Sequence, residues 1–109
     1  MNYSLLTLSL VAAAALTANR FVTAAGAVPS ANGNAVGVTR AGAASGELVP
    51  VDAIGTTMVE ASAAISAGAA VATTNDGRAV TFATGVVVGR ALTPATAAGQ
   101  LIEVLLINN

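Results

Sequence analysis

Several residue types on which catalytic and metal-binding sites depend are missing from this sequence. Its 109 residues include no His and no Cys, so the commonest general base, the thiolate nucleophile and the usual zinc ligands are absent. The lack of Cys also excludes a disulfide framework. The glycines form neither a P-loop nor a dinucleotide-binding motif, and no His is present to activate a Ser or Thr hydroxyl. We therefore expect no enzyme, no bound metal and no cofactor.

Charged and aromatic residues are also scarce. Only 8% of the residues are charged and 3% are aromatic, and four basic residues stand against five acidic ones for a net charge of −1. The charges are scattered singly with no basic stripe, so we expect no direct contact with nucleic acid. Hydrophobic residues make up 55% of the chain, but many are Ala, which predicts a thin core and many small apolar groups at the surface. Such a surface suits burial against partner molecules.

The N-terminal apolar run, residues 5–18, has more than one interpretation. A secretory signal peptide carries basic residues before its apolar run, whereas the first basic residue here is Arg20, after it. The run of about 15 residues is also shorter than the roughly 20 needed to span a bilayer, so no membrane partner is expected. One alternative stays open: a secreted or cell-surface β binding module with residues 1–18 as its signal peptide.

The spacing within this run favours an extended chain over a helix. Apolar residues alternate with mostly polar ones, Leu6, Leu8 and Leu10 with Thr7, Ser9 and Val11. We expect an extended N-terminal arm over residues 1–15 and a single β domain over residues 16–109. From Tyr3 to Val11 the arm is either covered by another chain or forms an edge strand of its own sheet.

The remaining sequence predicts short strands at intervals of about ten residues, which is typical of an all-β domain. The expected strands cover residues 16–23, 35–39, 48–51, 56–60, 69–74, 78–82, 85–93 and 100–107. Pro50 lacks a backbone donor, so its strand should lie at an edge or carry a bulge there. Residues 61–67 are the one stretch where a short helix is a serious alternative to extended or loop structure. We predict a small single domain of antiparallel strands with at most one or two short helical turns.

Two acidic residues have simple structural interpretations. Asp76 lies in the tight-turn sequence Asn75-Asp76-Gly77 and is expected to bond within that turn. Glu103 alternates with apolar neighbours in a predicted strand, so it faces solvent or pairs across the strands with Arg90.

Three segments together carry a resemblance to a known family: LTANRFVTAAGAVPSANGNAVGVTRAGAASGELVPV, VEASAAISAGAAVATTNDGRAV and VVVGRALTPATAAGQLIEVLL. In order and spacing they resemble the capsid cement, or head decoration, proteins of tailed bacteriophages. The resemblance implies a β-tulip or β-clip-like sandwich or barrel. An enzyme of the SAF-type β-clip class is suggested only by the strand pattern of residues 69–82.

The resemblance also implies a function. Such a protein binds the outer surface of the expanded capsid in the virion, after assembly in the bacterial host cytoplasm, and cements neighbouring major capsid proteins against internal DNA pressure. Its expected partners are the major capsid protein and copies of itself, in a homotrimer. The candidate partner-binding residues are those of the apolar arm: Tyr3, Leu5, Leu6, Leu8, Leu10 and Val11.

Overall fold

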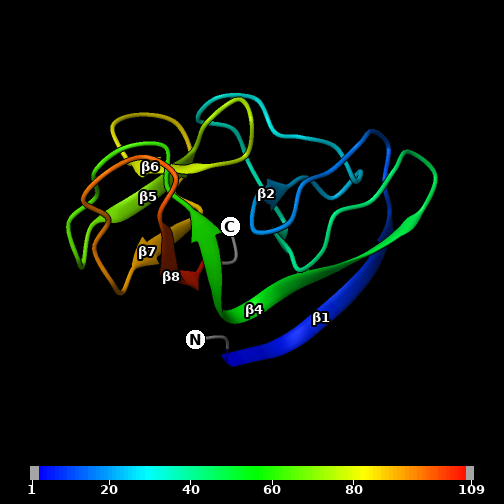
Figure 1. Cartoon of the computed structure of the whole chain (residues 1–109), viewed down its shortest axis with the longest axis horizontal. Coiled ribbons are helices and arrows are strands. Elements are labelled where there is room, and N and C mark those ends of the chain that lie inside the picture. Colours follow the sequence, from blue (N-terminus) through cyan, green and yellow to red (C-terminus); the bar gives the residue numbers. More distant parts are fainter. Residues whose placement is uncertain (1–2, 108–109) are drawn as a thin grey trace.

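The computed structural model describes residues 3–107, which form eight strands and no helix (Figure 1). The strands are β1 (Tyr3–Val11), β2 (Phe21–Val22), β3 (Gly37–Thr39), β4 (Leu48–Glu60), β5 (Ala70–Thr73), β6 (Ala79–Thr81), β7 (Gly89–Ala91) and β8 (Leu101–Leu106). All of their pairings are antiparallel. The predicted all-β fold is thereby confirmed. Residues 61–67, for which a short helix was the alternative, form no helix, and Ile65 within them makes a bridge to Ala95.

The strands form one sheet that curls almost into a barrel. Its order is β2-β3-β4-β8-β7-β5-β6, with β1 added to β4. The two ends of this order approach each other, because the Phe21 amide donates to the Gly77 carbonyl at 2.7 Å. A parallel bridge between Ala61 and Ala79 adds a second closing contact. Within residues 3–107 no helix is long and apolar enough to cross a membrane.

Strand β4 is the longest element and joins the two halves of the sheet. The sequence predicted two strands, residues 48–51 and 56–60, but the chain continues through them as one strand of 13 residues. Gly55 has a φ of 107°, and the pairing with β1 shifts register beside it. A positive φ is open to Gly at little steric cost, so the strand bends here without ending (Figure 1).

Pro50 lies in this strand and not, as expected, at a sheet edge or bulge. Its carbonyl accepts from the Arg40 amide at 3.0 Å, just beyond Thr39, where β3 ends. The N and C=O of one residue in an antiparallel strand point to the same side. The missing donor of Pro50 therefore faces Arg40, so the bond that is lost lies past the end of β3 and not within the paired part of β3 and β4.

The interior divides into two clusters built largely from Val and Ala, as the composition predicted. The main core gathers residues from every strand except β1 and from the loops that follow β4, precede β7 and follow β7: Phe21, Val38, Val59, Ala61, Ile65, Val71, Ala79, Val88, Ala91, Ala95, Ile102 and Val104. The small core lies beneath β1 and the first half of β4: Ala12, Leu16, Val22, Val49 and Val51. The first half of β4 thus contributes Val49 and Val51 to the small core, and the second half contributes Val59 to the main core.

Strand β1 has the predicted bounds and is an edge strand of the chain's own sheet. Its partner is the first half of β4, with Leu8 opposite Val51 and Leu10 opposite Val49. Figure 1 shows β1 running along β4 on one side of the molecule. The strand expected over residues 16–23 is shorter, because only Phe21–Val22 forms β2, while Leu16 makes an isolated bridge to Ala43.

Candidate docking surfaces

A buried carboxylate fastens β1 to the body of the domain. Asp52 is 0% exposed, and its Oδ1 accepts a hydrogen bond from Thr7 Oγ1 of β1 at 3.0 Å. Its Oδ2 accepts from Thr57 Oγ1 at 3.0 Å, and Arg40 Nε lies 3.5 Å from Oδ1. A buried charge is tolerated when it is paired and hydrogen-bonded. We call β1 together with residues 48–56 of β4 the β1–β4 ribbon.

The ribbon places two exposed apolar pairs at its ends. Val11 is 58% exposed and faces Leu48, which at 69% is the most exposed large hydrophobic residue described. Toward the other end, Leu6 and Ile54 face each other and are each 43% exposed. Sequence reasoning named Val11 and Leu6 but missed their partners from β4, because no local pattern shows which strand pairs with which.

The other candidate residues of the arm are placed differently. Leu8 and Leu10 are half-buried, and Leu10 packs against the small core. Tyr3 pairs with Thr56 through the backbone, while the side chains of Tyr3 and Leu5 lie outside the described part of the structure. The structure thus brings the candidate residues onto one strand; of the four whose side chains are described, Leu6 and Val11 are exposed and Leu8 and Leu10 are half-buried.

A second exposed apolar surface lies on the outer side of β7 and β8. Leu101 and Leu105 of β8 are 49% and 41% exposed, whereas Ile102 and Val104 between them are fully buried. Leu92, just after β7, is 43% exposed and bonds to the Glu103 carbonyl through its amide. We call Leu92, Leu101 and Leu105 the leucine face. No sequence pattern indicated this face, because apolar residues lie on both sides of β8.

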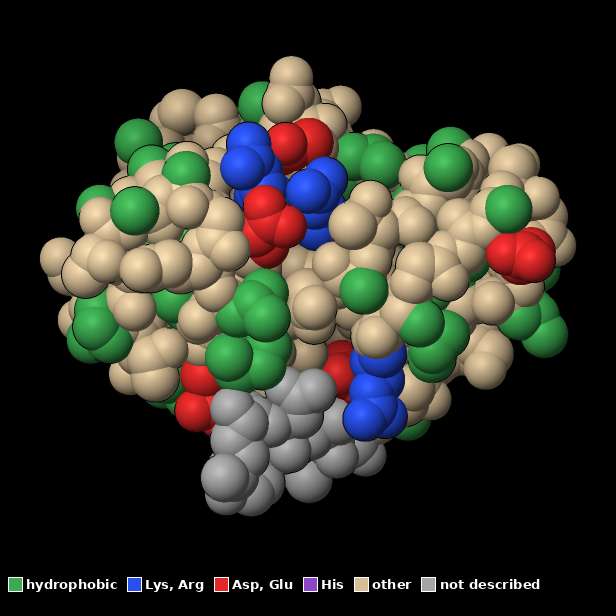
Figure 2. All heavy atoms as spheres, in the orientation of Figure 1, with side chains coloured by type: hydrophobic (Ala, Val, Ile, Leu, Met, Phe, Trp, Pro, Cys, Tyr) green, Lys and Arg blue, Asp and Glu red, His purple; other side chains and the backbone are tan. Residues whose placement is uncertain are grey.

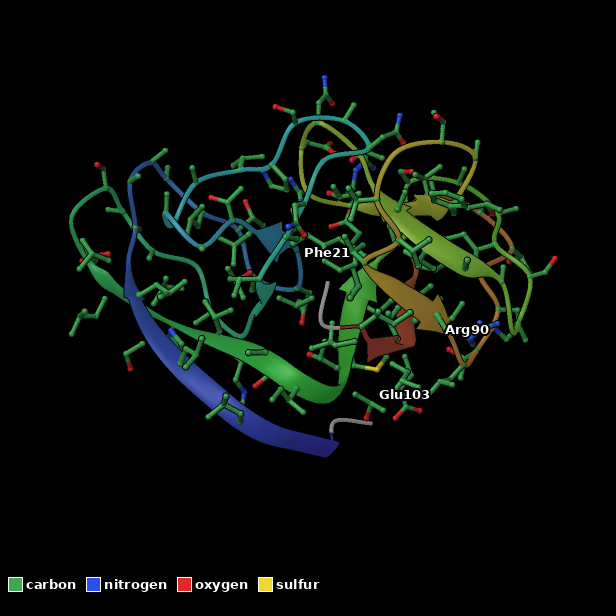
Figure 3. The ribbon with its side chains drawn as sticks, turned by 180° about the vertical axis from the view of Figure 1, so that it is seen from behind. Phe21, Arg90 and Glu103 are labelled. Carbon is green, nitrogen blue, oxygen red and sulfur yellow. The ribbon has the colours of Figure 1, made fainter. Side chains whose placement is uncertain are left out.

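Of the two interpretations of Glu103, the cross-strand pair with Arg90 is wrong (Figure 3). Arg90 lies opposite Leu105 and donates from Nη1 to the Gly68 carbonyl at 3.0 Å. Glu103 lies opposite Met58 and accepts from Thr56 Oγ1 at 3.0 Å. The register sets the two side chains diagonally, and each finds a closer partner. Both charges border the leucine face.

Four charged residues form a chain of ion pairs where β4 meets the turn between β5 and β6. Arg20 Nη2 lies 3.3 Å from Glu60 Oε1, Arg78 Nη1 lies 3.6 Å from Glu60 Oε2, and Arg78 Nε lies 2.9 Å from Asp76 Oδ2. Figure 2 shows basic and acidic side chains gathered in this way on the upper part of the molecule. These four side chains form a compact polar cluster of zero net charge.

Asp76 bonds within its turn, as predicted. Its carboxylate accepts hydrogen bonds from the Thr74 hydroxyl and from Arg78 Nε. The hydrogen bond from Thr74, aided by the charge of Arg78, lowers the pKa of Asp76 below its ordinary value. Gly77 has a φ of 83°, and a Cβ there would lie 2.8 Å from the Phe21 carbonyl oxygen. Glycine lets this turn pack closely against the start of β2.

A cavity of about 350 Å³ opens beside this charged cluster. Its walls come from the segment before β2, from β2 and the loop after it, from the end of β3, and from the turn between β5 and β6: Ala15, Leu16, Thr17, Arg20, Phe21, Val28, Thr39, Asn75 and Asp76. Arg20 Nε is buried and has no hydrogen-bond acceptor among the described residues. The described part of the chain contains no group of acidic residues that could hold a metal ion.

Comparisons with known proteins agree with the sequence resemblance. A family model described as phage cement protein matches residues 2–106. Among solved structures, the crystal structure of the head fiber gp8.5 N base in bacteriophage phi29 has the same fold, with a TM-score of 0.77. The two chains are 22% identical, and the match covers 94% of this chain and 93% of that one. A comparison with curated protein sequences finds no match.

Proposed function

Since this chain belongs to the phage cement protein family, we propose that it binds the outer surface of the expanded phage capsid and cements neighbouring major capsid proteins. The observation that carries this proposal is the number of exposed aliphatic side chains on a small domain: Leu6, Val11, Val28, Leu48, Ile54, Leu92, Leu101 and Leu105 are each at least 41% exposed. Contiguous exposed apolar surface on a soluble domain marks an interaction site. The chain has a structural role in the phage head and no enzymatic one.

The β1–β4 ribbon is the surface we propose for contact with the major capsid protein. The buried Asp52 and the pairing with β4 hold β1 in place before binding, so little chain entropy is lost on docking. If docking buried about 400 Å² of apolar surface, area bookkeeping gives roughly 10 kcal/mol gross. Among the described residues, β4 is the one strand beside β1. The outer edge of residues 8–11 of β1 can therefore add to a strand of the capsid protein by β-augmentation.

The leucine face is the surface we propose for association with further copies of the chain in a homotrimer. Leu92, Leu101 and Leu105 supply the apolar centre, and Arg90 and Glu103 supply charges of both signs at its border. Several ribbons in one assembly bind multivalently, so modest single contacts become a lasting attachment. Each bridge between capsid subunits raises the free energy needed to separate them under internal DNA pressure.

The alternative of a secreted module is less compatible with the described packing. Removal of residues 1–18 as a signal peptide would take away β1, including the Thr7 hydroxyl that bonds Asp52. It would also remove Ala12 and Leu16 from the small core. The rest of the domain would keep Asp52 but lose the hydrogen bond from Thr7 to it, and the small core would lose two of its five buried residues.

The direct test is reconstitution on expanded, undecorated capsids of the phage that encodes this chain. We expect saturable binding at a fixed stoichiometry and a higher temperature of heat-induced DNA release from filled heads. Labelling on intact particles should place the chain outside the shell. Failure to bind, or binding with no change in the release temperature, would contradict the cementing role.

A further inference from the structure

The leucine face carries two charged side chains on the same outer side of the sheet. Glu103 lies between Leu101 and Leu105 along β8, and alternate residues of a strand point to the same side, so its carboxylate stands among the exposed leucines. Arg90 lies on the neighbouring strand β7, opposite Leu105, and is exposed between two buried residues. Both are labelled beside β7 and β8 in Figure 3. A partner that covers the leucines therefore meets one charge of each sign.

Neither charge has an ionic partner among the described residues. The other three basic residues of the chain each form an ion pair with an acidic one, whereas Arg90 donates from Nη1 to the Gly68 carbonyl at 3.0 Å. Oε2 of Glu103 accepts from Thr56 Oγ1 at 3.0 Å, and no described residue donates to its Oε1. A guanidinium has five N–H donors and a carboxylate has two acceptor oxygens, so both groups can take a further partner.

The position of Glu103 restricts what can cover the leucine face. Because its carboxylate lies among the leucines, a partner that removes Leu101 and Leu105 from water also desolvates Glu103. A charge taken out of water is costly unless it gains an ion pair and hydrogen bonds. The partner must therefore bring a cation to Glu103 and an anion to Arg90, together with apolar surface.

A second copy of the same chain supplies all three features. Its leucine face brings apolar side chains, its Arg90 brings the cation and its Glu103 brings the anion. The two charges lie diagonally on neighbouring strands, because Arg90 is opposite Leu105 and not opposite Glu103. The surface is thus complementary to itself in chemistry, and complementary charges across an interface fix the relative orientation of the partners.

We propose that, where the leucine faces of two copies meet, Arg90 of one copy pairs with Glu103 of the next, and that this ion pair fixes how the copies are oriented. The proposal rests on the self-association proposed above and names the residues that direct it. In a closed ring every copy gives its Arg90 to one neighbour and its Glu103 to the other, so each contact contains one such pair. A guanidinium and a carboxylate can join through two parallel hydrogen bonds, which makes the pair directional.

Charge reversal with a restoring double variant tests the proposal. Arg90→Glu places two carboxylates in each contact, Glu103→Arg places two guanidinium groups there, and the double variant Arg90→Glu/Glu103→Arg restores an opposite pair with its direction reversed. Glu47→Arg is the matched control, because it makes the same charge change at an exposed residue that likewise accepts one hydrogen bond, from the Ala44 amide. Self-association is measured as a dissociation constant by sedimentation over a concentration series, with melting curves recorded alongside.

We expect each single reversal to raise the dissociation constant by at least about tenfold, because like charges that face each other across an interface are strongly unfavourable. The double variant should return to within about threefold of the wild type, since the two changes are coupled through the pair. Glu47→Arg should associate as the wild type does. The double variant loses the local hydrogen bonds of both side chains, so better folding would not explain its recovery.

The proposal is overturned, while self-association stands, if the wild type associates and the single reversals associate equally well. It is also overturned if the double variant associates no more tightly than the single variants, or if Glu47→Arg weakens association as much as they do. If the wild type is monomeric at every concentration, the proposed self-association fails, and this inference with it.

Discussion

The two halves of this domain are held together in different ways. Around β5, β7 and β8, the main core packs twelve buried residues, whereas the half beneath the β1–β4 ribbon has a small core of five. The smaller half compensates with the buried Asp52 and its contacts to Thr7, Thr57 and Arg40. Loss of one contact lowers the stability of an apolar core by a small step, whereas a buried charge that loses one partner is left incompletely hydrogen-bonded, which is costly. The strand proposed to bind the capsid, β1, therefore belongs to the half that is stabilised by one buried polar group, the Asp52 carboxylate.

The largest expected difference between the halves concerns truncation of a core side chain. Ile102 is 0% exposed in the main core, and Leu16 is 8% exposed in the small core. Truncation of buried Leu or Ile to Ala costs about 2–5 kcal/mol. We expect Ile102→Ala near the upper end and Leu16→Ala near the lower end, measured by denaturant unfolding. Equal losses would show that the two cores contribute alike.

Loss of the carboxylate at position 52 should loosen one half and spare the other. Asp52→Ala removes the acceptor of the buried Thr57 hydroxyl, which costs about 1–3 kcal/mol, and removes the hydrogen bond that ties Thr7 of β1 to β4. Arg40 is 47% exposed, so water can solvate it once its partner is gone. By hydrogen exchange, amides of β1 should lose protection more than those of β8. Uniform loss of protection over both strands would contradict the division into two halves.

Much of the smaller-scale structure could be predicted from the sequence. Alternation over residues 3–11 marks β1, and the Asn75-Asp76-Gly77 turn with its flanking residues locates β5 and β6. These features depend on neighbours in sequence, where period and turn chemistry are informative. The continuity of β4 could not be predicted, because a Gly that ends a strand and a Gly that bends one look alike.

The candidate surfaces were less predictable than the strands. Leu48 and Ile54 lie beside the exposed side chains of β1 because of the strand pairing, a contact between residues far apart in sequence. Asp52 is a single acidic residue in an apolar stretch, and its burial depends on Thr7 and Arg40 from two other segments. For the leucine face, an apolar residue on either side of β8 removes the alternation that would tell inside from outside.

Substitution on the leucine face should separate self-association from folding. Leu101→Ser removes an exposed side chain, so we expect a change in stability within about 0.5 kcal/mol. The same change should lower the mass of the assembly measured by light scattering. A matched control on the ribbon, Leu48→Ser, should leave that mass unchanged. A wild type that is monomeric at all concentrations would contradict self-association through this face.

The smallest expected effect concerns the turn between β5 and β6. The folded-state pKa of Asp76 is lowered, so its contribution to stability is present above the ordinary Asp value of about 3.9 and is lost as the pH falls through the lowered pKa. Asp76→Asn should destabilise the protein by under about 1 kcal/mol at pH 7, as is usual for exposed pairs. Melting curves of the two proteins should converge in acid. A difference that persists or grows at low pH would show that the carboxylate charge is not its cause.

The contrast between the ribbon and the leucine face is tested most directly by capsid binding of the Val11→Ser/Leu48→Ser double variant. Both side chains are more than half exposed, so the domain should fold and associate as the wild type does. We expect its affinity for expanded, undecorated capsids to fall by at least about a hundredfold, near 2.7 kcal/mol. Wild-type affinity in this variant, with folding and assembly intact, would contradict the claim that this chain cements the capsid through the β1–β4 ribbon.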